Sequence, residues 1–125
     1  MRVLVSIAVL LLSAISAQAQ RHVVGGQSIQ LYFLASINPD CTARGYSTMT
    51  VTQQPQHGRV RITRGSDFVT IPESNARSAC NRRRVPGVGI HYTAPRGYTG
   101  PDSVVVEMIT PSGRLRRGTF NLYVR

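Results

Sequence analysis

Apolar and polar residues alternate along most of the chain after residue 20. Three runs in the second half each place their apolar residues on one face: Val88, Ile90 and Tyr92; Val104, Val106 and Met108; Phe120, Leu122 and Val124. Shorter runs in the first half do the same: Ile29, Leu31, Phe33 and Ala35; Met49 and Val51; Val60 and Ile62. Strict alternation indicates half-buried β-strands. The β-branched and aromatic residues in these runs favour the same conformation.

Turn signals separate these runs. Pro55-Gln56-His57-Gly58 lies between two strand patterns, and hairpin turns are predicted at Arg64–Asp67 and Thr110–Gly113. Nothing after Gln20 shows a helical period over two turns. About seven short strands at this spacing predict an all-β fold, an Ig-like antiparallel β-sandwich, with a small barrel as the alternative.

The N-terminus has the three parts of a cleavable secretory signal. Met1-Arg2 is followed by an apolar run, Val3–Ile15, and then by Ala17-Gln18-Ala19. The run is shorter than the about 20 residues that span a bilayer. We therefore expect residues 1–19 to be a signal peptide and residues 20–125 to be one periplasmic or extracellular domain without a transmembrane segment. The alternatives are an uncleaved anchor or a buried helix.

Cys41 and Cys80 are the two cysteines of the chain. An even count in an exported protein predicts a disulfide. The absence of C-x-x-C argues against a zinc or thioredoxin-like redox site. The bond would tie the loop around Cys41 to the segment Ser74–Gly87, which has few apolar residues and is expected to be an exposed loop.

All fifteen basic residues are arginine. Without Arg2, fourteen remain against five acidic residues, which gives a formal net charge of +9. Such a charge attracts anionic polymers and surfaces, and the planar guanidinium suits phosphate and carboxylate groups. The candidate binding residues are the arginines of the expected loop, Arg77, Arg82, Arg83 and Arg84. A loop whose charges are merely solvated is the alternative.

The expected partner is an anionic envelope polymer, a lipid head group or an acidic protein. Specific nucleic-acid binding is not expected, because no aromatic residues for base stacking interleave with the Arg82-Arg83-Arg84 run.

No motif in the chain predicts catalysis, a metal or a cofactor. His22, His57 and His91 have no metal-binding spacing, and neither G-x-S-x-G nor a glycine-rich phosphate loop occurs. Calcium requires several carboxylate oxygens, which a chain with five acidic residues barely supplies. These features predict a protein that is not an enzyme and has neither catalytic residues nor a cofactor.

Two segments, Thr50–Val60 and His91–Ser103, carry a family resemblance. They resemble the P-x-H-G-x-V turn and the Y-T-P-x-x-G-[FY]-x-G-x-D-S motif of bacterial Ig-like and cadherin-like repeats of surface adhesins. The resemblance covers roughly residues 29–125 and implies a β-sandwich. It further implies that Gly58 serves a tight turn, that Tyr98 packs over the end of the sandwich, and that Asp102 ties the loop by accepting backbone hydrogen bonds.

The chain departs from those repeats in two ways, since it holds a single copy and has the Cys41/Cys80 pair. Both departures argue against an adhesin role. We therefore expect a small exported, non-enzymatic Ig-like interaction module of the bacterial envelope that binds an anionic partner through arginine-rich loops. The alternative is a small envelope hydrolase or inhibitor with its active groups on loops.

Overall fold

The computed structural model describes residues 19–125. The predicted signal peptide therefore lies outside the described residues, except for Ala19. The elements in chain order are β1 (Arg21–Val23), β2 (Ser28–Leu34), β3 (Ser36–Ile37), β4 (Ala43–Gly45), β5 (Thr48–Gln53), β6 (Arg59–Asp67), the 3-10 helix η1 (Ala76–Arg82), β7 (Val85–Thr93), β8 (Gly100–Ile109) and β9 (Leu115–Val124). None of the helical residues between 19 and 125 forms a segment long and apolar enough to cross a membrane.

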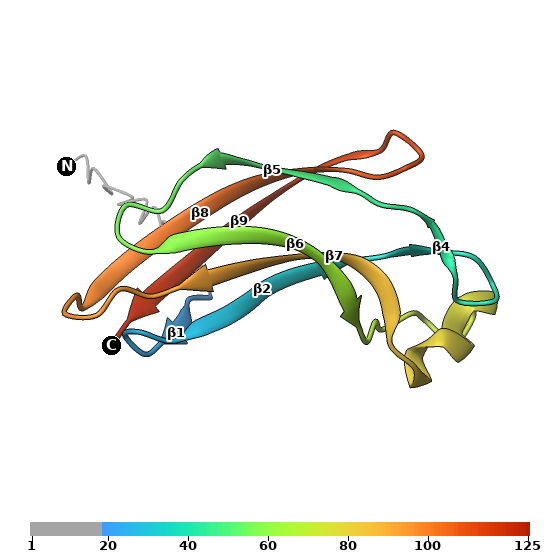
Figure 1. Ribbon diagram of the computed structural model, residues 1–125, viewed down its shortest axis with the longest axis horizontal. Coiled ribbons are helices and arrows are strands. Elements are labelled where there is room, and N and C mark those ends of the chain that lie inside the picture. The colour runs from blue at the N-terminus through green and yellow to red at the C-terminus, as the bar shows by residue number, and fades with distance from the viewer. Residues whose placement is uncertain (1–18) are drawn as a thin grey trace, which may run out of the picture.

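Two sheets face each other (Figure 1). One has the strand order β1-β9-β8-β5 and the other β2-β7-β6. The pairs are antiparallel except for β1 beside β9, which is parallel. Along the chain, the six long strands β2, β5, β6, β7, β8 and β9 are divided between the sheets in the order of strands B to G of an Ig domain, where B, E and D share one sheet and C, F and G the other. The predicted all-β sandwich is confirmed, and the short β3–β4 ladder is an addition that alternation did not predict.

The core between the sheets consists of the inward residues of the alternating runs. Val104, Val106 and Leu122 are fully buried, and so are Ile90 and Tyr92 on the facing sheet. Burying one such aliphatic side chain stabilises the fold by about 1.5–3 kcal/mol before the entropy cost of ordering it. The predicted inward faces of β7, β8 and the second half of β9 are confirmed.

The strand β2 departs from the prediction because it contains a bulge. The register with β7 shifts between Gln30 and Tyr32, so the later residues change face. Tyr32 and Leu34 join Leu31 in the main core, whereas Phe33 packs with Ala35 against a second cluster. The prediction of a single apolar face over Ile29–Ala35 was therefore wrong.

Two of the three predicted turns are confirmed. Pro55–Gly58 joins β5 to β6, and Thr110–Gly113 joins β8 to β9. Gly113 has φ of 83° and donates its N–H to the Thr110 carbonyl at 2.8 Å. The hairpin turn predicted at Arg64–Asp67 was wrong. These residues continue β6 in register with the start of β7, because their partners come from a segment about twenty residues later in the chain.

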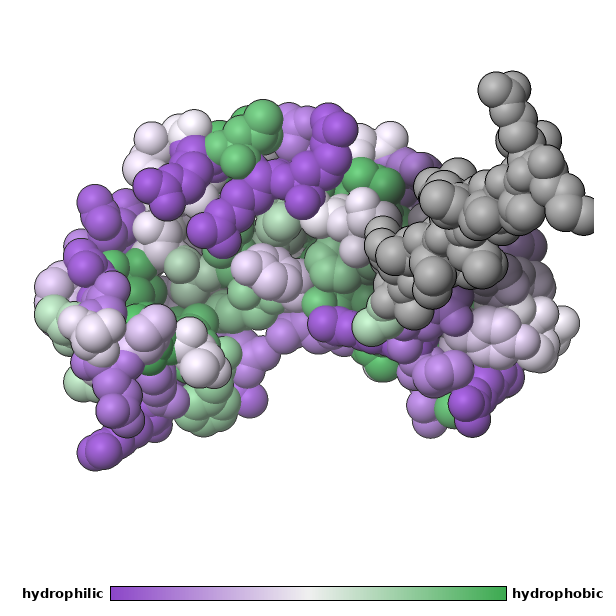
Figure 2. Space-filling model, turned by 180° about the vertical axis from the view of Figure 1, so that it is seen from behind, coloured by the Kyte–Doolittle hydropathy of each residue, from purple (hydrophilic) through white to green (hydrophobic). Residues whose placement is uncertain are grey.

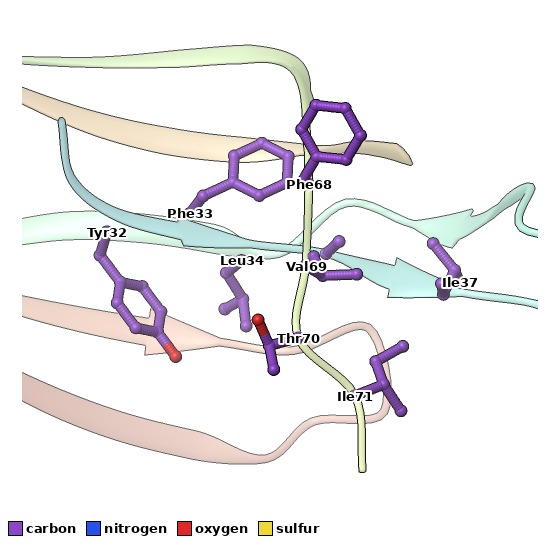
Figure 3. A pocket seen from close by; sticks show the side chains of 9 residues that line it. Tyr32, Phe33, Leu34, Ile37, Phe68, Val69, Thr70 and Ile71 are labelled. Carbon is purple, nitrogen blue, oxygen red and sulfur yellow. The ribbon is translucent and has the colours of Figure 1, made fainter. Parts of the chain in front are cut away.

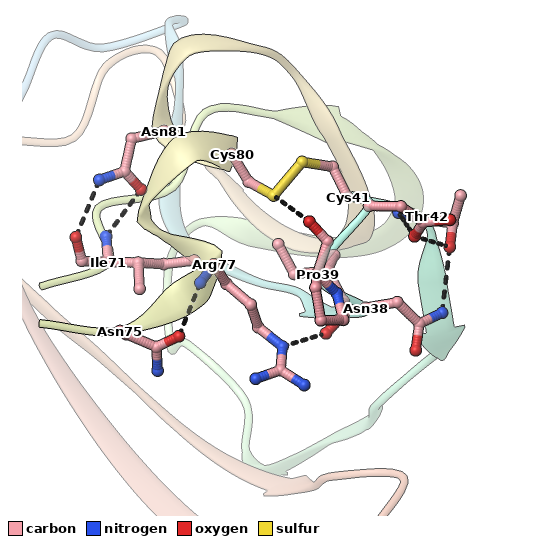
Figure 4. The surroundings of a disulfide bond; sticks show 11 residues. Asn38, Pro39, Cys41, Thr42, Ile71, Asn75, Arg77, Cys80 and Asn81 are labelled. Atoms are coloured by element: carbon pink, nitrogen blue, oxygen red, sulfur yellow. Dashed lines mark hydrogen bonds between the residues drawn. A yellow bond between two sulfur atoms is a disulfide. The ribbon is translucent and has the colours of Figure 1, made fainter. Parts of the chain in front are cut away.

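A second apolar cluster lies at the η1 end of the molecule (Figure 4). The predicted disulfide is present, with 5.6 Å between the Cα atoms of Cys41 and Cys80, and Cys80 is fully buried. Val85 and Ile37 pack around it. The expected exposed loop over Ser74–Gly87 was therefore only partly right. Arg82, Arg83 and Arg84 are exposed and Arg77 is half-buried. The segment folds into η1 and the first residues of β7 because Cys80 and Val85 anchor it in this cluster.

Candidate functional site

Arg77 is held by the protein itself. It lies in the first turn of η1, where its backbone N–H donates to the Asn75 side chain at 2.9 Å. Its Nε donates to the Ile37 carbonyl at 2.8 Å (Figure 4). The guanidinium therefore joins η1 to β3, and this contact is a structural role for one of the four arginines predicted to bind a partner.

The other three predicted arginines are exposed but have different neighbours. Arg84 donates to the Ser66 carbonyl at 2.8 Å and lies 5.3 Å from the centre of the Phe68 ring. Arg83 lies near Asp40, whose pKa is lowered mainly by hydrogen bonds from Thr42 and to a smaller extent by the Arg83 charge. Their different neighbours show that the run does not form one compact cluster.

Arg82 borders a shallow hollow beside η1. Glu73, Ser78, Ala79 and Asn81 line the rest of it. The Asn81 side chain is not available to a ligand, because its amide donates to the Ile71 carbonyl and its oxygen accepts from the Ile71 N–H, both at 2.8 Å. The hollow thus offers one cation next to one carboxylate, which is a weak arrangement for holding an anion.

A second basic surface lies on the outer face of the β2-β7-β6 sheet. We define this outer face by the residues that pair in register and point away from the core: Ser28, Gln30, Arg59, Arg61, Thr63, His91 and Thr93. Arg61 pairs with His91, and Arg59 pairs with Thr93. This surface was not predicted from the sequence, because outward positions of alternating strands are ordinarily solvated. Their polar character was visible, but their adjacency depends on the strand pairing.

The outer face contains two adjoining hollows of about 320 and 200 Å³. His91 and Thr63 line both. Gly89 and Gly65 occupy outward positions in the smaller hollow, and neither has a side chain that would fill it. The β6 and β7 strands bend at the η1 end (Figure 1), and the outline of the molecule is arched between that end and the opposite one (Figure 2). The two hollows make the outer face locally concave.

The cations of the outer face are available to a ligand. Arg59 and Arg61 are exposed, and no acidic side chain contacts either. The single ion pair between residues 19 and 125 joins Arg117 to Glu107 at 3.8 Å, on the other sheet. The acid nearest the outer face is Asp67, which accepts a hydrogen bond from Gln30 at 2.7 Å. That bond, the Phe68 N–H and the Arg84 charge lower the pKa of Asp67, so it carries a negative charge at the η1 end of this face.

A further hollow, of about 350 Å³, is lined mostly by apolar residues. It forms where the segment Phe68–Ile71 crosses the end of β2 (Figure 3). Phe68 is 55% exposed, whereas Val69 and Ile71 pack against the second cluster. The side chains lining this hollow carry no charge, so it offers neither an acid–base pair nor an anion site.

The Asp102 carboxylate is buried and fully occupied. It accepts hydrogen bonds from the backbone N–H groups of Gln56, Gly58 and Ser103 at 2.9 to 3.0 Å, from His57 N–H at 3.3 Å, and from the Tyr92 hydroxyl at 2.7 Å. Burial alone would raise the pKa of Asp102, but these hydrogen bonds outweigh burial and lower it. Burial, followed by the bond to Asp102, raises the pKa of Tyr92.

The three structural roles implied by the resemblance are present. Asp102 ties the loop after β5, as expected. A Cβ on Gly58 would lie 2.3 Å from the Tyr92 ring, so only glycine fits that turn without displacing a core side chain. Tyr98 packs against the core, and its ring stacks on His57 with 3.7 Å between centroids.

The three histidines lie in different parts of the structure and make different contacts. His57 is stacked on Tyr98, and the Nδ1 atom of His22 accepts a hydrogen bond from Arg125 at 3.1 Å. His91 lies on the outer face, as the alternation predicted. Within residues 19–125, no three side chains of the metal-ligating types come together.

Comparison with protein-family models and with curated proteins finds no match for this chain. The resemblance to adhesin repeats therefore stays a prediction that rests on the two motifs and on the residue roles described above.

Proposed function

We propose that residues 20–125 form a non-enzymatic interaction module of the bacterial envelope that binds an anionic partner. The observation that carries this proposal is the imbalance of charge on the folded surface. Residues 20–125 contain fourteen arginines and five acidic residues. One of those acids, Asp102, is buried, and its hydrogen bonds are all made within the protein. Arginines without acidic partners keep their donors available for carboxylate, sulfate or phosphate groups.

The placement of the reactive groups supports binding over catalysis. His57 and Asp102 meet in the turn after β5, but Asp102 receives the backbone N–H of His57 and the imidazole is stacked on Tyr98. A general base must be able to reach a substrate proton. Here the carboxylate's acceptor sites are already filled by five donors, which supports a structural role.

Export of the module is part of the proposal. Disulfides form and persist in oxidising compartments such as the periplasm. The bond between Cys41 and Cys80 is compatible with export, and the predicted signal peptide over residues 1–19 gives a route to it. We place the module in the periplasm or outside the cell on these grounds.

The binding proposal is tested with the mature domain, heparin and anionic vesicles. We expect binding at low salt that weakens steeply as salt increases, because screening acts over about 8 Å at physiological ionic strength. Failure of the domain to bind either probe at low salt would contradict the proposal.

The contribution of the predicted loop is tested separately with the double substitution Arg82→Ser/Arg83→Ser. Arg84 is kept, because it holds the Ser66 carbonyl. A matched control, Arg114→Ser/Arg116→Ser, removes the same charge from exposed residues at the β8–β9 turn. A larger loss of affinity and a shallower salt dependence in the loop variant would assign the loop to binding. Equal effects in the two variants would mean that Arg82 and Arg83 are only solvated.

A further inference from the structure

We propose that the concave outer face of the β2-β7-β6 sheet is the principal binding site, and that its ligand is an extended acidic polysaccharide. This inference rests on the proposed function and gives it a location and a ligand class. The two cations of this face, Arg59 at the start of β6 and Arg61, come from alternate positions of one strand. Such positions are roughly 7 Å apart along a strand, so the ligand would lie along β6 with successive anionic groups on successive arginines.

Neutral hydrogen-bonding groups surround these cations and indicate a hydroxyl-bearing ligand. The Ser28 and Thr93 hydroxyls contact each other at 2.6 Å. Thr63 is the next outward residue of β6 after Arg61. His91 lies between them and borders both hollows. Side-chain hydroxyls can both donate and accept, as sugar hydroxyls do. A ligand that carries acids and hydroxyls on one chain matches this surface better than one that carries charge alone.

The shape of the face favours an extended chain over a membrane. A flat bilayer surface cannot enter the two hollows of this face, whereas a narrow polymer can. Gly65 leaves room above the backbone, whereas the side chains of His91, Gln30 and Phe33 lie close over Gly89. The Phe33 ring provides a half-buried apolar surface there. One half-buried aromatic ring gives little stacking for successive bases, so single-stranded nucleic acid fits this face less well.

Asp67 sets the limit of the site. Its negative charge lies at the end of the face toward η1, where it repels anions. We therefore expect the anionic groups of the ligand to lie beside Arg59, Arg61 and His91, and a neutral, hydroxyl-bearing part of the same chain to lie in the hollow lined by Gly65 and Gly89.

The test uses the mature domain with heparin, polygalacturonate, neutral dextran and single-stranded poly-dT as probes. Arg59→Ser/Arg61→Ser removes the two cations of the outer face, and Arg114→Ser/Arg116→Ser is the charge-matched control on the other sheet. Gly65→Trp fills the groove without changing charge, because a Cβ there meets no atom within 4 Å, and Gly65→Ala is its small control. Thermal unfolding of each variant checks that the fold is retained.

We expect the Arg59/Arg61 variant to bind heparin or polygalacturonate at least about tenfold more weakly, since each charge-assisted hydrogen bond lost is worth about that factor. The control pair should lose less than about threefold, Gly65→Trp should weaken binding, and Gly65→Ala should not. Dextran should not bind.

Equal losses in the two arginine pairs, or unchanged binding by a folded Gly65→Trp variant, would overturn the site while leaving the proposed function standing. Tighter binding of poly-dT than of either polysaccharide would overturn the ligand class. Absence of binding to every polyanion would instead overturn the proposed function itself.

Discussion

Asp102 shows how one buried carboxylate can close the end of a sandwich. It lies near the start of β8, and its acceptor sites receive the Tyr92 hydroxyl from β7 and three backbone N–H groups from the turn after β5. Buried polar groups are costly when unpaired and specific when satisfied. This contact could be predicted from the D-S and H-G pairs of the two motifs. In the repeats that carry these motifs, the aspartate is expected to bind the backbone of the turn.

Replacing Asp102 by Ala should lower the free energy of unfolding by about 3 kcal/mol or more, because the buried Tyr92 hydroxyl and the turn N–H groups lose their acceptor. Asp67→Ala is the control, since Asp67 is a partly exposed acid whose Gln30 partner can turn to water. Its loss should be much smaller than that of Asp102, because the Asp67 carboxylate is solvated. Chemical denaturation of both variants measures the two free energies of unfolding. Equal decreases in the two variants would contradict the structural role of Asp102.

The lowered pKa of Asp102 gives a pH dependence with a defined sign. Its carboxylate is more acidic in the folded state than in the unfolded state, where the pKa is about 3.9. Its contribution is therefore complete above about pH 4 and is lost as the pH falls through the folded-state value. Denaturation between pH 7 and pH 2 should show this loss, and Asp102→Asn should show a smaller one. A pH profile that is identical in both proteins would refute the assignment.

At the scale of elements, alternation predicted the strands whose partners follow the simple pattern. The inward residues of β8 and β7 are those that alternation selects, because β8 keeps an unbroken register with β9, and β7 with β6. The bulge in β2 and the continuation of β6 past Arg64 could not be predicted this way. Both depend on the register with β7, a partner that is distant in sequence. The outer face was missed for the same reason, since Arg61 and His91 become neighbours only through that pairing.

The disulfide stabilises the η1 end, where only a small apolar cluster holds the chain together. Cys80→Ser should lower the free energy of unfolding by about 4 kcal/mol, as expected for opening a loop of about 40 residues. It also places a hydroxyl at a fully buried position. Wild-type protein under reducing conditions is the control, because it lacks the bond but keeps both side chains. Loss of less than about 1 kcal/mol in both cases would show that η1 is held by packing alone.

At the scale of the whole molecule, the charge is divided between regions with different partners. The β8–β9 turn region pairs one arginine with Glu107, Arg77 and Arg84 hold backbone carbonyls, and the outer face keeps Arg59 and Arg61 without acidic neighbours. Net charge predicts attraction to anions but not its location. The location follows from the fold, which brings cations and hydroxyls together on a concave surface.

Export makes a direct prediction about the mature chain. Mass spectrometry of the protein from the periplasm or medium should find a chain that begins at Gln20, with or without cyclisation of that residue to pyroglutamate. Cleavage after Ala19 follows from the small residues before it. A mature protein that retains Val3–Ile15 would contradict export by a cleaved signal peptide.

The central claim is that this sandwich binds an acidic chain on one face. The most direct measurement is an NMR titration of the isotope-labelled mature domain with short polygalacturonate oligomers at low salt. We predict that backbone amide signals of residues 59–63 and 89–93 shift together and saturably, while those of residues 110–117 remain unchanged. Shifts spread evenly over all exposed arginines, or confined to residues 110–117, would contradict the claim.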